Sequence, residues 1–274
     1  MSDEYLHDNE QLRAVLQQIS AQLKYSLGNI YSALERIAPA QARDEDEKLD
    51  QNAAVLCQSY YRVLRLANNL DDAVNLESPS RVKLTNDDIA GLCRRVADEA
   101  RACAELLGLE LEFVCEKQTH IISMNADRLE RLLLNLLSNA FKFTPRGGKI
   151  TLEIKIGRQN VELIVTDTGR GIAPQRLEHI FDRYLMTDTL DSLPYGLGLG
   201  LPICRRIARE HGGGILLTSE EGKGTTVAVS LPNKRSSIQE LSTYVIDYAG
   251  GFNRTLVELS DALPRQAFTQ RFLD

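Results

Sequence analysis

Apolar residues recur every three or four positions along the first part of the chain. This spacing predicts two long amphipathic helices between about residues 5 and 76, because a helix gathers such positions on one face. The polar segment 38–48 contains Pro39, which breaks a helix, and is expected to be the linker. The first apolar stripe is Leu12, Leu16, Ile19, Leu23, Leu27, Ile30, Leu34 and Ile37, and the second is Leu49, Ala53, Leu56, Tyr60, Val63, Ala67, Leu70 and Val74.

Two helices alone cannot cover both of these stripes. A second copy of the hairpin would cover them and form a four-helix bundle. We therefore expect residues 1–78 to be a dimerisation domain. The alternative is that the hairpin packs onto the rest of its own chain.

The pattern becomes mixed α/β after a short polar joint at residues 77–81. Thr85 and the acidic residues after it predict a helix start, with the helix running to about Leu107. Further helices are expected at 126–142 and 202–211, and strands at 109–116, 149–156 and 161–167. Residues 214–232 predict a β-hairpin with its turn at 221–224.

Composition narrows the possible functions. The net charge of −6, without a lysine or arginine cluster, argues against nucleic-acid binding. No apolar run is long enough to span a bilayer, and the acidic start of the chain does not resemble a signal peptide, so a cytoplasmic protein is expected. The five cysteines form no CxxC pair and are expected to be reduced, and the four histidines show no metal-ligand spacing.

Two asparagines stand out on the predicted helix 126–142. Asn135 and Asn139 are four residues apart and so share one face of an otherwise apolar helix. Buried amides need partners, and their oxygens can coordinate a hard divalent cation that carries phosphates. Lys142, one turn later, adds a positive charge that can bind phosphate.

A carboxylate follows at the end of the predicted strand 161–167. Asp167 precedes Gly169 and Gly171, so it lies beside a flexible loop and can accept a hydrogen bond from an exocyclic amine. An ordinary Asp-containing turn is the alternative explanation.

Alternating glycines precede another predicted helix. Gly196, Gly198 and Gly200 come just before Pro202, and such glycines let the backbone approach an anion at a helix N-terminus. The loop lacks the GK[ST] ending of a Walker loop and does not follow a strand, so neither common nucleotide fingerprint applies.

Taken in order, segments 127–145, 167–172, 196–201 and 222–226 resemble the N, G1, G2 and G3 boxes of sensor histidine kinases, and 180–184 resembles the F box. These kinases belong to the ATPase superfamily that includes DNA gyrase and the heat-shock chaperone ATPases. The resemblance covers about residues 10–232. It implies an α+β protein, with a helical hairpin (a four-helix bundle as a dimer) followed by a two-layer α/β sandwich that binds ATP at residues 79–232.

The resemblance also implies roles for individual residues. Asn139 would hold Mg²⁺ with help from Asn135, Lys142 would contact phosphates, and Asp167 and Thr225 would bind the adenine amino group. The glycines would frame a mobile lid over ATP at residues 182–195. The complete implied ATP-binding set is Asn135, Asn139, Lys142, Asp167, Gly169, Gly171, Arg183, Tyr184, Gly196, Gly198, Gly200, Leu201 and Thr225.

The chain departs from this family in its first helix. The family motif there is roughly S-H-E-L-R-x-P-L, whereas this chain has SAQLKYSL at 20–27, with Ala21 at the phosphoacceptor position, Gln22 and Ser26. Alanine has no nucleophilic atom, and glutamine cannot act as a general base. In the lid only Arg183 is basic, so weaker closure over ATP and slow turnover are expected.

We therefore expect a cytosolic dimeric histidine-kinase homologue that binds ATP–Mg²⁺ but does not phosphorylate itself at position 21. One alternative is an active kinase that phosphorylates a partner protein or His7, although His7 lies roughly 21 Å along the helix from position 21. Anti-sigma-factor kinases do act on partners, but they place a glutamate base where this chain has Asn135. A structural dimer with a vestigial pocket is another alternative.

The resemblance leaves two further expectations. A response-regulator receiver would be the family partner, and His211, at a helix end typical of the fold, is expected to be structural. Residues 233–274 lie outside the family pattern, with a predicted strand at 242–248 and a helix at 253–263. This extension is expected to dock on the ATP-binding domain or the hairpin and to regulate or recruit. A packing cap without further function is the alternative.

Overall fold

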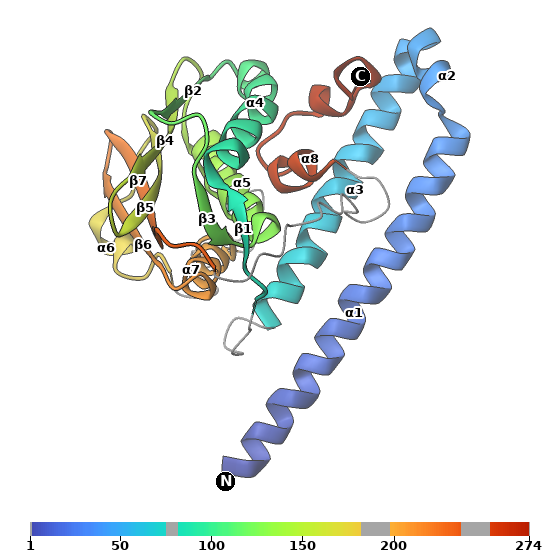
Figure 1. Cartoon of the computed structure of the whole chain (residues 1–274). Coiled ribbons are helices and arrows are strands. Elements are labelled where there is room, and N and C mark those ends of the chain that lie inside the picture. Colours follow the sequence, from blue (N-terminus) through green and yellow to red (C-terminus); the bar gives the residue numbers. More distant parts are fainter. Residues whose placement is uncertain (1, 75–81, 182–197, 237–252, 274) are drawn as a thin grey trace. The chain divides into compact units, whose positions relative to one another are not determined.

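The computed structural model describes residues 2–74, 82–181, 198–236 and 253–273 (Figure 1). The chain divides into two compact units, the first formed by Met1–Ser78 with Leu263–Asp274 and the second by Pro79–Ala262. The C-terminal extension expected after Pro232 is therefore shared between the two units. The sequence pattern did not predict this division.

The first unit is built on a helical hairpin. Helices α1 (Ser2–Ile37) and α3 (Glu47–Val74) pack against one another, and the N-terminal part of α1 extends beyond the end of α3 (Figure 1). The linker expected at 38–48 is largely helical instead, since it contains α2 (Ala40–Glu45). Pro39 precedes α2 at its N-cap, where the missing N–H of proline costs no helical hydrogen bond.

Part of the C-terminal extension completes this unit. The short helices η2 (Arg265–Phe268) and α9 (Gln270–Leu273) pack on α3 and α2 respectively. Phe268 is fully buried with its ring centroid 5.5 Å from that of Tyr61. The guanidinium of Arg43 donates to the carbonyl of Phe268 at 2.8 Å and to Asp50 at 2.8 Å, so a buried charge fixes the docked segment.

The second unit contains a five-stranded mixed sheet with the order β2-β4-β5-β7-β6. Strands β2 and β4 are parallel, and every other neighbouring pair is antiparallel. The strands are β2 (Glu110–Cys115), β4 (Lys149–Ile156), β5 (Asn160–Asp167), β6 (Gly214–Glu220) and β7 (Gly224–Pro232).

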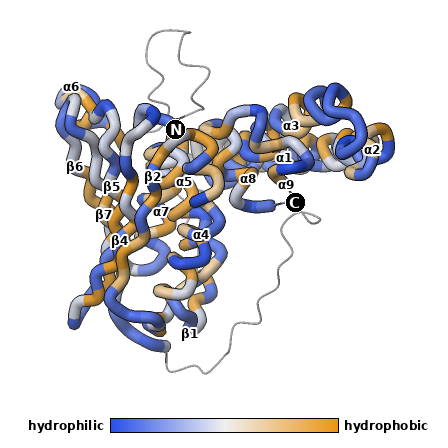
Figure 2. Tube along the Cα trace, turned by 90° about the horizontal axis from the view of Figure 1, so that it is seen from above, coloured by the Kyte–Doolittle hydropathy of each residue, from blue (hydrophilic) through white to orange (hydrophobic). Residues whose placement is uncertain are grey.

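Helices α4 (Ile89–Leu107), α5 (Ala126–Phe143) and α7 (Gly200–Glu210) cover one face of this sheet (Figure 1). Burial alternates along β4, where Ile150, Leu152 and Ile154 face the helices, as the period of two in a strand requires. Hydrophobic positions recur along the strands and α5 in Figure 2. The predicted α/β sandwich after a helical hairpin is confirmed. The short helix α6 (Pro174–Leu177) follows β5.

The predicted helix start at Thr85 is wrong. Residues Thr85–Asp88 form strand β1, which pairs antiparallel with β3 (Ile121–Met124), and the helix begins at Ile89. Asp88 is the N-cap, because its carboxylate accepts from the N–H of Ala90 at 3.2 Å and from that of His120 at 2.8 Å. The acidic residues therefore precede the helix instead of filling its first turn.

The second part of the extension lies in the second unit. Helix α8 (Arg254–Leu259) forms within the predicted helix 253–263 but ends earlier, and the strand predicted at 242–248 lies outside the described residues. No described helix combines the length and apolar character needed to cross a membrane. All five cysteines lie in the described part of the chain, and none forms a disulfide.

Candidate functional site

Asn135 and Asn139 lie on one face of α5, as predicted. Asn125 caps this helix by accepting from the N–H of Arg128 at 3.0 Å, which fixes where the helical register begins. Asn135 is only 1% exposed, whereas Asn139 is partly exposed. A β-carbon at Gly200 would lie 3.3 Å from Oδ1 of Asn135 and 3.9 Å from Nδ2 of Asn139. The first turn of α7 thus approaches both amides closely.

Asp167 lies at the end of β5, opposite Thr225 of β7. Its Oδ1 accepts from the N–H of Gly169 at 2.8 Å. Burial raises the pKa of this carboxyl, and the N–H groups of Gly169 and Thr225 partly offset that shift. An oriented, buried carboxylate of this kind can accept a hydrogen bond from a ligand amine.

The turn after Asp167 packs against the end of α5. The N–H of Arg170 donates to the carbonyl of Phe143 at 3.1 Å, and the Arg170 guanidinium lies 4.7 Å from the centroid of the Phe143 ring. A β-carbon at Gly169 would lie 2.5 Å from the same carbonyl, so only glycine fits there. This contact brings the G1 segment against the C-terminal end of the helix that carries the two asparagines.

The G1 and G3 segments are joined in the same way. The N–H of Gly222 donates to the carbonyl of Arg170 at 2.8 Å. Gly171 has a φ of 65°, and a side chain there would also collide with the carbonyl of Glu220. Gly171 therefore permits the close approach of the two loops.

Ser219 is a site residue that sequence reasoning missed. Its Oγ accepts from the N–H of Ile172 at 2.9 Å and lies 2.9 Å from Oγ1 of Thr225. It thereby fixes the hydroxyl of Thr225 and the G1 loop together. The alternation of β6 places it on a predictable face, but nothing in the sequence marked it as part of the site.

Lys142 and Asn135 contact the C-terminal extension, which was expected to dock on this domain or the hairpin, although the sequence did not indicate these two contacts. Nζ of Lys142 lies 3.2 Å from Oδ2 of Asp261, and Nδ2 of Asn135 donates to Oε2 of Glu258 at 3.3 Å and to the carbonyl of Arg131 at 3.0 Å. The apolar pattern of 253–263 signalled a helix here, but its two acidic residues had no apparent partner in the sequence.

The remaining predicted site residues divide into two groups. Gly198, with a φ of 67°, and Leu201 lie at the start of α7. Arg183, Tyr184 and Gly196 lie outside the described residues, and so does the predicted lid at 182–195.

The donor set suits one kind of metal. Within the described residues no group of three or more His, Cys, Asp or Glu side chains could hold a metal ion. The amide oxygens of Asn135 and Asn139 are neutral, hard ligands that suit Mg²⁺ when phosphates supply the negative charge. These residues therefore fit a cation that arrives with a nucleotide better than a cation held by the protein alone.

The structure describes Ala21, the position at which the resemblance predicts a phosphoacceptor. Ala21 is exposed on α1, and its neighbour Ser20 is buried and donates to the carbonyl of Ala67 at 3.0 Å. Gln22 and Ser26 are exposed as well. The position is accessible, but its side chain offers no nucleophile.

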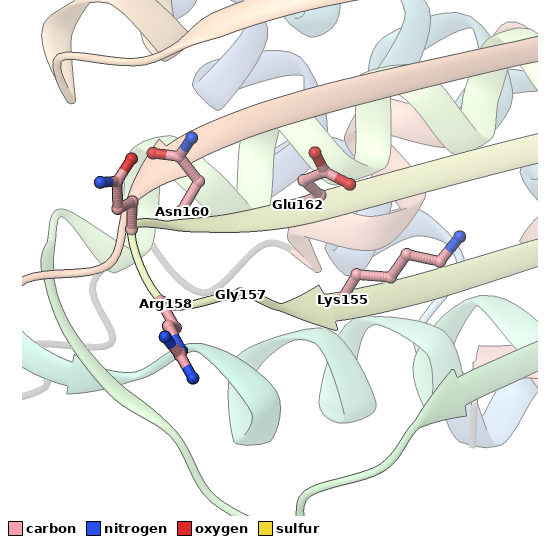
Figure 3. Close-up of a pocket in the computed structure, with 6 residues that line it drawn as sticks. Lys155, Gly157, Arg158, Asn160 and Glu162 are labelled. Carbon is pink, nitrogen blue, oxygen red and sulfur yellow. The ribbon is translucent and has the colours of Figure 1, made fainter.

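A surface hollow of about 460 Å³ lies at the turn between β4 and β5 (Figure 3). Asn160, which lines it, begins β5, whereas Asp167 ends that strand, so the two are roughly 24 Å apart. The hollow is lined by Lys155, Gly157, Arg158, Gln159, Asn160 and Glu162. It contains none of the predicted nucleotide ligands and is a separate surface feature.

The sequence is similar to one protein family and to sensor proteins of known sequence. Residues 124–235 match the family of histidine kinase-, DNA gyrase B-, and HSP90-like ATPases. The sensor protein SrrB of Staphylococcus aureus (strain N315) is 33% identical over 230 residues, which is 82% of this chain and 39% of SrrB. The chain thus spans well under half the length of this relative.

Solved structures agree with this relationship. Full-length ShkA in complex with AMPPNP aligns over 84% of this chain and 47% of its own, with a TM-score of 0.64 and 26% identity. The catalytic domain of histidine kinase ThkA aligns over 56% of this chain and 99% of its own, with a TM-score of 0.50 and 26% identity. The chain therefore has the fold of a histidine-kinase catalytic core, and its residues 124–235 match the histidine kinase-, DNA gyrase B-, and HSP90-like ATPase family.

Proposed function

We propose that the second unit binds ATP–Mg²⁺ at the face formed by α5, the Asp167 turn and the start of α7. The gathering of Asn135 and Asn139 beside Gly200 is the observation that carries this proposal. Asp167 would accept from the adenine amino group, Lys142 would contact phosphates, and the two asparagines would hold Mg²⁺. The neighbouring ShkA structure, which contains AMPPNP, supports the ligand class.

Calorimetric titration with ATP, with and without Mg²⁺, tests this binding. Asn139→Ala should lose the Mg²⁺-dependent part of the affinity, while Asn160→Ala, at the far end of β5, should bind as the unmodified protein does. Equal affinities for all three proteins, or no binding at millimolar ATP, would contradict the proposal and favour a structural dimer with a vestigial pocket.

We also propose that the hairpin pairs with a second copy of itself. Its apolar stripes are only partly covered in one chain, since Ile19 is 46% exposed and Leu56 is 54% exposed. Other apolar side chains on the same helices are exposed as well, namely Leu12, Val15, Leu23, Ile30, Val63 and Leu66. A four-helix bundle would remove these side chains from water.

The third element of the proposal is that ATP binding occurs without phosphate transfer to position 21. Ala21 offers no nucleophilic atom, so the protein would act as a dimeric, nucleotide-gated signalling module with a response-regulator receiver as the expected kind of partner. Incubation with γ-labelled ATP tests this point. Stable label on a histidine would contradict it and would favour the alternative that His7 accepts phosphate.

A second candidate function is phosphorylation of a partner protein. The carboxylate of Glu258, 3.3 Å from Asn135, is an acidic group near the place where partner-directed kinases carry a base. Labelling of a co-purified protein in the presence of ATP would favour this function. Its absence, with ATP binding confirmed, would count against it.

A further inference from the structure

The segment Asn253–Asp261, hereafter the acidic segment, docks directly on the helix that carries the proposed nucleotide ligands. Its apolar residues Leu256, Val257 and Leu259 are buried within the second unit, where α8 packs on α5. Asn253 caps α8 by accepting from the N–H of Leu256 at 3.2 Å. The cap therefore stabilises the start of α8, and burial of its apolar side chains holds it against α5.

The first acidic residue of the segment reaches the asparagine face. Glu258 is 0% exposed, and its two oxygens contact different groups of α5. Oε2 accepts from Asn135 at 3.3 Å, and Oε1 lies 3.2 Å from Nε of Arg131. A carboxylate thus lies on the amide that is proposed to help hold Mg²⁺ and phosphate.

The second acidic residue reaches the proposed phosphate-binding lysine. Oδ2 of Asp261 lies 3.2 Å from Nζ of Lys142, whose side chain is only 6% exposed. Phosphate could not reach Lys142 in this arrangement without displacing a carboxylate. Two of the four main polar residues of the proposed site are therefore engaged by the same nine residues of chain, through two independent contacts.

Further contacts hold the segment from its other end. Arg254 makes ion pairs with Asp127 at 3.2 Å and with Glu130 at 3.1 Å, and Thr255 donates to Glu99 at 2.6 Å. These anchors lie on α4 and the first turns of α5, away from Asn139 and Lys142. They can persist while the acidic end of the segment moves.

We propose that the acidic segment is an internal ligand that competes with the phosphates of ATP for Asn135 and Lys142. This inference rests on the proposed function, because it assumes that these residues bind nucleotide. The chain would then bind ATP only in the fraction of molecules whose segment is released, and the apparent affinity would fall by that fraction.

The charges indicate that the acidic segment and the phosphates of ATP cannot occupy the site at the same time. Two carboxylates beside a polyphosphate would repel it in a partly buried environment, where Coulomb interactions are stronger than in water. Arg131 and Glu258 form a buried ion pair, with 3.2 Å between Nε and Oε1. The mutual attraction of two buried charges repays only part of the cost of taking them out of water, so release of this pair is not prohibitive.

The test compares ATP–Mg²⁺ affinity by calorimetry in the full chain and in three variants. Glu258→Gln, Asp261→Asn and their combination keep side-chain shape but remove the charges. We expect the double variant to bind ATP at least roughly tenfold more tightly, as it would if about 90% of the molecules are docked. Glu105→Gln, an exposed carboxylate on α4, is the matched control and should leave the affinity unchanged.

A double-mutant cycle locates the effect. Lys142→Met should weaken ATP binding, and Asp261→Asn should give no further gain in that background, because the two charges act as a pair. Hydrogen exchange of the α8 amides should become faster when ATP–Mg²⁺ is added to the unmodified chain. This readout does not depend on substituting the buried Glu258, so it holds even if Glu258→Gln disturbs folding.

The outcomes separate the two proposals. If the chain binds ATP but the charge-removing variants bind it equally or more weakly, or α8 becomes more protected, the competition is wrong and the proposed function stands. If neither the chain nor any variant binds ATP, the proposed function fails and the inference fails with it.

Discussion

The two units of this protein differ in how they bury their apolar residues and in the side chains at their predicted functional positions. The second unit buries its apolar residues around a regular sheet and carries the asparagines, aspartate and glycines that are predicted to bind nucleotide. The hairpin of the first unit leaves apolar residues such as Ile19 and Leu56 exposed and has Ala21 where the resemblance predicts a phosphoacceptor. If the proposed function holds, nucleotide binding and phosphate acceptance are carried by different units, and the variants below test them separately.

The largest expected effect concerns how the hairpin unit depends on the C-terminal residues. Phe268→Ala should destabilise that unit by about 3–5 kcal/mol, because a fully buried aromatic side chain is removed beside Tyr61. Hydrogen exchange of α3 should speed up while that of α5 stays unchanged. Arg271→Ala, an exposed position on α9, is the control. Equal exchange in both variants would show that the hairpin does not need this segment.

The next effect concerns the second unit, where one substitution should change ATP binding and stability differently. Asp167→Asn should weaken ATP binding by about 3 kcal/mol, more than roughly a hundredfold, because a charged acceptor is lost. Calorimetry measures this loss. Glu162→Gln, an exposed carboxylate on the same strand, should have no effect.

Asp167→Asn should not lower the free energy of unfolding of the ligand-free protein, although it weakens ATP binding. Burial raises the pKa of Asp167 above its ordinary 3.8, so its contribution to stability is full below that value and is lost as pH rises through the raised pKa. Asp167→Asn removes this loss. The ligand-free variant should therefore be at least as stable as the unmodified protein at neutral pH, and a clear destabilisation would contradict this explanation.

A smaller effect tests the exposed stripe of the hairpin. Ile19→Ser should weaken dimerisation by about 2 kcal/mol, roughly thirtyfold, because the side chain would be lost from both copies in a symmetric interface. Analytical ultracentrifugation measures the dimer dissociation constant. Gln17→Ser, on the opposite face of the same helix, should leave it unchanged. A monomer in every case would instead favour packing of the hairpin within its own chain.

The smallest effect concerns His211. Burial lowers the pKa of its imidazole, and the geometry suits a neutral ring, with Nδ1 2.7 Å from the carbonyl of Ile207 and Nε2 accepting from the N–H of Asn125 at 3.0 Å. Stability from this group is present above its ordinary pKa of 6.5 and is lost as pH falls through the lowered value. Thermal melts below pH 6.5 should show a decline that His211→Gln reduces. An identical decline in both proteins would assign it to other groups.

Sequence periodicity predicted the long elements well, for physical reasons that are easy to state. The helix with Asn135 and the strands of the sheet carry long, regular apolar patterns, and those patterns match the observed elements. Strand β1 was missed because Asp87 and Asp88 resemble first-turn helix residues, whereas Asp88 is actually a cap shared with the N–H of His120. Local pattern cannot show a partner strand that lies more than thirty residues away.

The candidate site was predictable only in part. Its residues on α5 and β5 were identified because they occur in recognisable segments, and the structure brings them near one another, although their roles remain predictions. Glu258 and Asp261 were not identified because their contacts depend on tertiary packing of a short helix. A six-residue helix carries too little periodicity to show which of its faces is buried.

The division of the C-terminal residues between the units has a consequence for the order of events on the ribosome. The second unit is, in effect, an insertion within the first, since Leu263–Asp274 complete a unit that begins at Met1. The hairpin helices are made before the ATPase domain, whereas Phe268 and the residues around it are made after that domain. The first unit therefore completes its folding after the second. Its hairpin must remain able to bind the C-terminal residues while the domain between them is synthesised.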